Sequence, residues 1–131
     1  MMGSRELLDA VTEQRWSEAR RLIESNIGLE YRTAQGLTPL MMALLHGRED
    51  IARALIEKGA DVNAAETAST GFTCLHLACK AGLAEIVRLL IQKGARVNTP
   101  DYGGITPADV AAHQGYAEIA DILRQPHAEG K

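Results

Sequence analysis

The feature that most constrains this chain is an internal repeat with a period of 33 to 35 residues. The motif Gly-x-Thr recurs three times, with its threonine at Thr38, Thr73 and Thr106. Nine residues after each threonine comes a glycine, at Gly47, Gly82 and Gly115. Two landmarks that stay in register across three copies indicate a repeat architecture, in which each unit buries its apolar face only against its neighbours.

Each unit has the pattern of a helical hairpin. Thr38 and Thr106 stand directly before a proline, and threonine caps a helix while proline suits its first position. The first helix is expected to end at the glycine landmark, because glycine tolerates the left-handed backbone that closes a helix. In the third unit, the apolar residues of the second helix share one face and form its predicted core stripe: Ile86, Val87, Leu90 and Ile91.

Composition limits the classes of protein that fit. The 131 residues are 46% hydrophobic but only 4% aromatic, which favours closely packed helices over a β-sandwich. The net charge is -3, with both signs mixed along the chain, so we expect no nucleic-acid partner. The longest apolar run, residues 40–45, predicts no membrane insertion. We expect an intracellular protein, cytoplasmic or nuclear, with reduced cysteines.

The repeated segments resemble the ankyrin repeat. They are Gly-x-Thr-Pro-Leu-x-x-Ala, Gly-x-x-Glu-Ile-Val-x-Leu-Leu and Gly-Ala-Asp-Val-Asn, and the best copy of the first runs from Thr73 to Cys79. The resemblance implies an all-α solenoid of about four helix-turn-helix repeats with β-hairpin-like finger loops. It also assigns a bridging hydrogen-bond role to His76. Met41 and Asp109 stand at that position in the flanking repeats, where the bridge is therefore in doubt.

Residues 5–25 form a degenerate first unit that is typical of a capping repeat. Its Gln14 and Asn26 occupy the positions of the glycines that end the two helices in later units. We expect a single domain over residues 5–125, complete at both ends, with repeats at about 5–33, 34–66, 67–101 and 102–125. The start (1–4) and tail (126–131) are expected to be disordered. The finger over residues 64–72 carries a two-residue insertion relative to the next one.

No catalytic or metal chemistry is expected. Cys74, His76 and Cys79 are good zinc ligand types, but on a helix residues 74 and 76 point about 200° apart. Cys79 is better explained as a buried structural thiol. The chain shows no nucleophile elbow and no phosphate-binding glycine loop. We therefore expect no enzyme activity, no cofactor and no metal.

The resemblance implies a protein-interaction module, monomeric when free, that serves as a scaffold, adaptor or competitive inhibitor. The alternative is a regulatory or targeting segment of a larger enzyme or channel. The partner, another protein, is expected on the concave face formed by finger loops and first helices. The candidate contact residues are Arg32, Gln35, Leu37, Leu45, His46, Thr70, Phe72, Lys80, Tyr102, Ile105, His113 and Gln114, with Ala34, Glu66, Ala81 and Pro100 beside them.

Two features of this set leave alternatives open. Leu37, Phe72 and Ile105 occupy one equivalent slot before the threonine, and they predict either an exposed binding stripe or packing between fingers. Asn63 and Asn98 follow the Val of the Gly-Ala-x-Val-Asn segment, which resembles the family sites modified by the oxygen-sensing asparaginyl hydroxylase. The alternative is that each asparagine only braces the finger turn.

Overall fold

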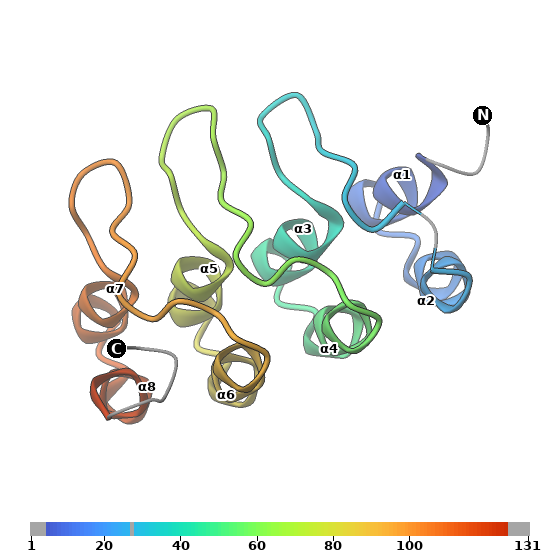
Figure 1. Cartoon of the computed structure of the whole chain (residues 1–131). Coiled ribbons are helices and arrows are strands. Elements are labelled where there is room, and N and C mark those ends of the chain that lie inside the picture. Colours follow the sequence, from blue (N-terminus) through green and yellow to red (C-terminus); the bar gives the residue numbers. More distant parts are fainter. Residues whose placement is uncertain (1–4, 27, 126–131) are drawn as a thin grey trace.

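The computed structural model describes residues 5–26 and 28–125, which fold into four consecutive helical hairpins stacked side by side (Figure 1). The inner helices are α1 (Glu6–Thr12), α3 (Pro39–Leu45), α5 (Cys74–Ala81) and α7 (Pro107–Gln114), and the finger loops rise at the starts of α3, α5 and α7. The outer helices are α2 (Trp16–Glu24), α4 (Glu49–Glu57), α6 (Ala84–Gln92) and α8 (Ala117–Arg124). Within the described residues no β-strand is present, and a single antiparallel bridge joins Ala65 to Thr73. The all-α solenoid expected from the sequence is confirmed, while the ends expected to be disordered lie outside the described residues.

The threonine landmarks cap the inner helices as expected. Thr38, Thr73 and Thr106 all have extended backbone, and each hydroxyl accepts a hydrogen bond from the amide three residues on. The N···O distances are 3.3, 3.3 and 3.2 Å. Each cap satisfies an amide that the first helical turn would otherwise leave unpaired.

The register assigned to the degenerate first repeat is also correct. Gln14 and Asn26 have φ of 62° and 59°, and they are the two non-glycine residues with positive φ in the chain that the structure describes. Gly47 and Gly59, at the equivalent positions of the second repeat, have φ of 69° and 98°. The first repeat therefore keeps the left-handed backbone at both helix ends without the residue that adopts it most easily.

The core lies between the two rows of helices and between successive hairpins. The predicted stripe of α6 is buried, whereas Glu85, Arg88, Gln92 and Lys93 of the same helix are exposed. All six residues of Cys74–Cys79 in α5 are buried, because α3 and α7 pack against this helix from both sides. In α7 only Pro107 and Ala111 are buried.

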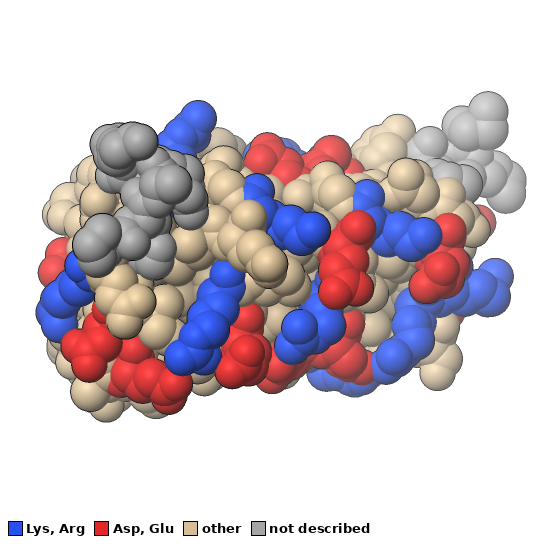
Figure 2. Space-filling model, turned by 60° about the horizontal axis from the view of Figure 1, so that its bottom comes forward, with Lys and Arg blue, Asp and Glu red and all other residues tan. Residues whose placement is uncertain are grey.

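The surface formed by the outer helices, called the convex back, carries charges that pair between neighbouring outer helices. Figure 2 shows basic and acidic side chains interspersed over this surface. Arg20 on α2 binds Asp50 on α4, and Arg88 on α6 binds Glu118 on α8 at 3.1 Å. A hydrogen bond from the Arg48 side chain lowers the pKa of Asp50 to about 2. Such exposed pairs add little stability, but they leave much of the charge on the back already neutralised.

Candidate protein-binding face

Three finger loops form one wall of the candidate face. Each is closed by a backbone hydrogen bond, from Thr33 N to Leu37 O at 2.9 Å, from Glu66 N to Phe72 O at 2.8 Å and from Asp101 N to Ile105 O at 2.8 Å. The first residue of each pair also caps its own tip, since its side-chain oxygen accepts backbone amides of the turn. A closing backbone hydrogen bond and a side-chain cap of the turn therefore shape all three fingers.

The longer second finger is held by a longer side chain. Glu66 stands where the next finger has Asp101, and its carboxylate accepts the backbone amides of Ser69, Thr70 and Gly71. Hydrogen bonds from the Thr70 hydroxyl and from these amides lower the pKa of Glu66 to about 2. Glu66 is only 6% exposed. The Glu66 carboxylate is therefore committed to its own finger.

The fingers also bind one another. Tyr102 N donates to Thr70 O at 2.9 Å, and the Tyr102 hydroxyl donates to Thr67 O at 3.2 Å. Its ring lies against Gly71, where an added Cβ would come within 2.5 Å of the ring. Arg32 on the first finger donates to Ala65 O on the second at 2.9 Å. Contacts between fingers are thus made by Tyr102 and Arg32, and the Tyr102 side chain remains 66% exposed.

His76 joins the third repeat to the fourth. Its Nδ1 accepts the Thr73 amide at 3.0 Å, so the neutral ring carries its proton on Nε2, which donates to Ile105 O at 2.7 Å. Phe72 stacks on this ring at 5.2 Å. Asp109, at the equivalent place in α7, accepts the Thr106 amide at 3.1 Å but is exposed. Asp109 therefore keeps the capping hydrogen bond with Thr106. Its carboxylate can only accept hydrogen bonds, so it cannot donate a bridging hydrogen bond as His76 does.

The cysteines beside His76 lie inside the helix packing. Burial raises the pKa of both Cys74 and Cys79 to about 12, which disfavours the thiolate form that metals and electrophiles require. The Cys74 thiol donates to Ala64 O at 3.7 Å. Across the part of the chain that the structure describes, no three His, Cys, Asp or Glu side chains are grouped to hold a metal ion.

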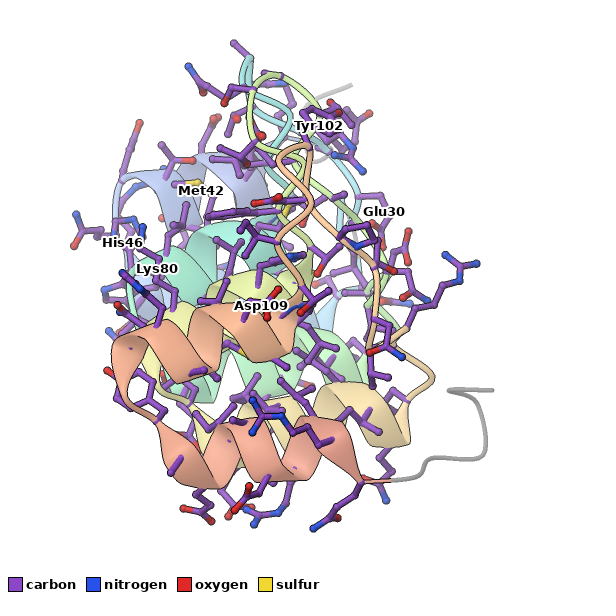
Figure 3. All side chains as sticks on the ribbon, turned by 90° about the vertical axis from the view of Figure 1, so that its left-hand side faces the viewer. Glu30, Met42, His46, Lys80, Tyr102 and Asp109 are labelled. Atoms are coloured by element: carbon purple, nitrogen blue, oxygen red, sulfur yellow. The ribbon has the colours of Figure 1, made fainter. Side chains whose placement is uncertain are left out.

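The predicted contact residues lie on the finger loops and at the C-terminal ends of the inner helices, which together form one side of the stack. Figure 3 looks along the stack, with Tyr102 high on the fingers and with Met42, His46 and Lys80 along the inner helices. Ten of the twelve residues are exposed: Arg32, Gln35, Leu45, His46, Thr70, Lys80, Tyr102, Ile105, His113 and Gln114. Leu37 and Phe72 are half-buried against the core instead of facing solvent. They form the floor at the base of the fingers and not a projecting stripe.

A groove of about 490 Å³ opens on this side between α5 and α7. Phe72, Ile105 and Val110 supply its apolar lining, and Lys80, Asp109, His113 and Gln114 complete it. Sequence reasoning missed Val110 and Asp109 as residues that line the groove. The available signal was their register, since Val110 corresponds to the buried Leu77 but belongs to the last repeat.

The comparisons with known proteins agree with this geometry. A family model described as ankyrin repeats in three copies matches residues 7–66 and 63–130. This chain belongs to the ankyrin-repeat family. Ankyrin repeats are generally protein–protein interaction modules and are typically without enzyme activity.

Individual relatives match only part of this ankyrin-repeat chain. Human ankyrin repeat and KH domain-containing protein 1 is 43% identical over 49 residues, 37% of this chain and 2% of the human one. The ankyrin repeat and KH domain-containing protein mask of Drosophila melanogaster is 48% identical over 44 residues, 34% of this chain and 1% of its own. Human ankyrin repeat domain-containing protein 17 is 48% identical over 42 residues, 32% of this chain and 2% of its own. The chain therefore corresponds to a very small share of each of these relatives.

The two asparagines of the ankyrin motif differ in their surroundings. The Asn63 side chain donates to Gly94 O at 3.3 Å and accepts the Arg96 amide at 2.9 Å, so it braces the next repeat and not its own finger turn. In the first repeat Glu30 takes this role by accepting the Asp61 amide at 2.9 Å. Asn98 is exposed.

Across residues 5–26 and 28–125, no helix is long and apolar enough to cross a lipid bilayer.

Proposed function

We propose that this ankyrin-repeat chain binds a partner protein through the concave face formed by its finger loops and inner helices, as a scaffold, adaptor or competitive inhibitor. The observation that carries the proposal is the contrast between the two sides of the stack. Leu45 and Ile105 are 50% and 42% exposed on the concave side, whereas the convex side carries charges that pair with one another. Exposed apolar side chains gathered on one face favour an interface there.

The concave face is also built to stay rigid, which supports the proposal. The fingers are tied to one another by Tyr102 and Arg32 and to the helices by His76. A pre-organised surface loses less conformational entropy on binding. We further propose an intracellular, cytoplasmic or nuclear role, a monomeric free state, the four-repeat division given above, and action without catalysis, cofactor or nucleic-acid binding.

The test uses the exposed residues of the face, because the half-buried Leu37 and Phe72 would confound binding with folding. The full chain is used as bait for affinity purification with mass spectrometry, and affinities are then measured for Leu45→Ala combined with Ile105→Ala. The matched control is Tyr31→Ala, a residue 42% exposed that lines a separate hollow with Lys58 and Gly59. We expect the double variant to lose about 2 kcal/mol of binding at unchanged melting temperature. An equal loss in the control would place the interface elsewhere.

A second candidate role is favoured by the short span of the matches. Because the chain covers only 1% to 2% of its relatives, it could act as a regulatory or targeting segment of a larger enzyme or channel. The mass of the native protein, measured by immunoblot from its source, separates the two roles. A native mass close to 14.2 kDa would favour the free-standing module.

We also propose Asn63 and Asn98 as acceptors for asparaginyl hydroxylation. Asn98 should react first, because it is exposed while both polar atoms of the Asn63 amide are held by the next repeat. Intact-mass measurement after treatment with the hydroxylase should show one added oxygen before a second. Absence of any added oxygen, even on chain loosened by mild denaturant, would rule the modification out.

A further inference from the structure

The groove between α5 and α7 has opposite charges at its two ends. Lys80 is the second-last residue of α5, at the end away from the fingers, whereas Asp109 lies in the first turn of α7, at the finger end. Figure 3 shows these two residues at separate positions along the helices. Because the inner helices of successive repeats run in the same direction, the groove has a basic end and an acidic end.

Neither charge is neutralised by an ion pair among the described residues. Lys80 is exposed, and Asp109 is exposed with hydrogen bonds only to Thr106. Arg124 acts electrostatically on Asp109 but forms no ion pair with it. Arg20, Lys58 and Arg88 each pair with a carboxylate of an outer helix, whereas Lys80 and Asp109 remain available to a partner.

The apolar lining of the groove is firmly built. Phe72 is held by its stack on the buried His76, and Ile105 is fixed through its carbonyl by the same ring. Val110 is half-buried and lies one residue after Asp109. These three side chains form a pre-organised apolar floor with a volume of about 490 Å³ above it, which is the size range of side-chain and ligand pockets.

We infer that this groove is a bipolar subsite, which takes one apolar side chain of the partner protein flanked by an acidic residue toward Lys80 and a basic residue toward Asp109. The inference rests on the proposed function and adds the chemistry of the segment that is recognised. An extended segment advances about 3.3 Å per residue. His113 occupies in α7 the register position that Lys80 occupies in α5, and it lies about 6 Å along the helix from Asp109. The charged partner residues therefore lie one or two positions from the apolar one.

The neighbouring repeats explain why this chemistry is local to one groove. Leu45 of α3 stands where α5 has Lys80, and buried Met41 and His76 stand where α7 has Asp109. Among the described residues, only the junction of α5 and α7 combines an exposed cation with an exposed anion in these two register positions. Charge complementarity at such a place selects the partner and its orientation more than it adds affinity.

The test uses three synthetic nonapeptides with the same central leucine. One carries glutamates on one side of the leucine and lysines on the other, the second carries glutamates on both sides, and the third lysines on both. Each is titrated at low salt into the full chain labelled with ¹⁵N, and the amide shifts are followed by NMR. We expect the mixed peptide to shift the amides of Lys80, Asp109 and Val110 and to bind about two- to tenfold tighter than either single-sign peptide.

Charge variants supply the decisive comparison. Lys80→Glu should transfer the preference to the lysine-only peptide, and Asp109→Asn, which can still accept the Thr106 amide, should reduce the discrimination against the glutamate-only peptide. Lys93→Glu, at an exposed cation that ends the outer helix α6, is the control and should leave the order unchanged. Equal affinities for the three peptides, no shifts in the groove, or an equal effect of Lys93→Glu would overturn the inference.

The same titration separates this inference from the proposed function. Shifts confined to the concave residues of α1 and α3 would overturn the bipolar subsite but leave a concave interface in place. Shifts confined to the outer helices α2, α4, α6 and α8 would overturn both.

Discussion

Equivalent residues of successive repeats make different contacts, as His76 and Asp109 show. Each accepts the amide of its capping threonine, but only His76 is buried, stacks on Phe72 and donates to the next repeat. His76→Ala leaves polar groups of Thr73 and Ile105 without partners inside the protein. We expect a loss of about 3 kcal/mol of unfolding free energy, measured by urea denaturation.

Asp109→Ala is the matched control for this prediction. It removes the same capping contact at an exposed site, so its effect should be a small fraction of that of His76→Ala. Equal losses in the two variants would mean that capping matters and that the bridge between repeats contributes nothing.

Glu66 predicts how the second finger responds to acid. Its pKa is about 2 in the folded chain against 4.5 without the finger's hydrogen bonds, so the folded state favours the carboxylate. The stabilisation is complete above about pH 4.5, declines as the pH falls from 4.5 toward 2, and is absent below. Glu66→Gln should therefore flatten the fall of stability between pH 4.5 and 2, as measured by urea denaturation at several pH values.

Other carboxylates, including Asp50, titrate over the same range in both proteins, so the difference between wild type and Glu66→Gln isolates the finger. Identical pH profiles for the two proteins would show that the Glu66 contacts do not couple to folding.

At the level of elements, the second and third fingers act as one unit, because Tyr102 of the third finger packs against the second. Gly71 and Gly47 have nearly the same φ, 73° and 69°, but an added Cβ meets the Tyr102 ring only at Gly71. Gly47→Ala should cost about 1 kcal/mol for the left-handed backbone alone. Gly71→Ala should cost more, because Tyr102 must also leave its place.

A double-mutant cycle tests this finger contact. In a Tyr102→Ala background, Gly71→Ala should cost no more than Gly47→Ala does in wild type, as measured from thermal unfolding. If the extra cost persists without the tyrosine ring, the fingers do not depend on this contact.

At the level of the whole molecule, the sequence predicted the features that follow from repeat register and missed those that depend on loop geometry or on a missing neighbour. The caps at Thr38, Thr73 and Thr106 and the helix ends at Gln14 and Asn26 follow from local backbone chemistry in fixed register, so they could be located in advance. Val110 could not be placed so easily, because a periodic pattern does not tell which residues lose a neighbour. The commitment of Glu66 to its own finger depends on loop geometry that no spacing reveals.

The stacking also predicts how stability is distributed along the chain. Each hairpin buries its apolar face only against its neighbours, and α5, packed between α3 and α7, is the inner helix with the longest buried run, Cys74–Cys79. Amide hydrogen exchange should therefore be slowest in α5 and α6 and fastest in α1, α2, α7 and α8, with protection rising toward the middle of the stack. The buried Cys74 and Cys79 thiols provide an independent probe, since alkylation requires the same opening and should be slow in the native state. Uniform exchange from residue 5 to 125, or alkylation of Cys79 faster than exchange at α8, would contradict nearest-neighbour stabilisation, because the centre would then open without the ends.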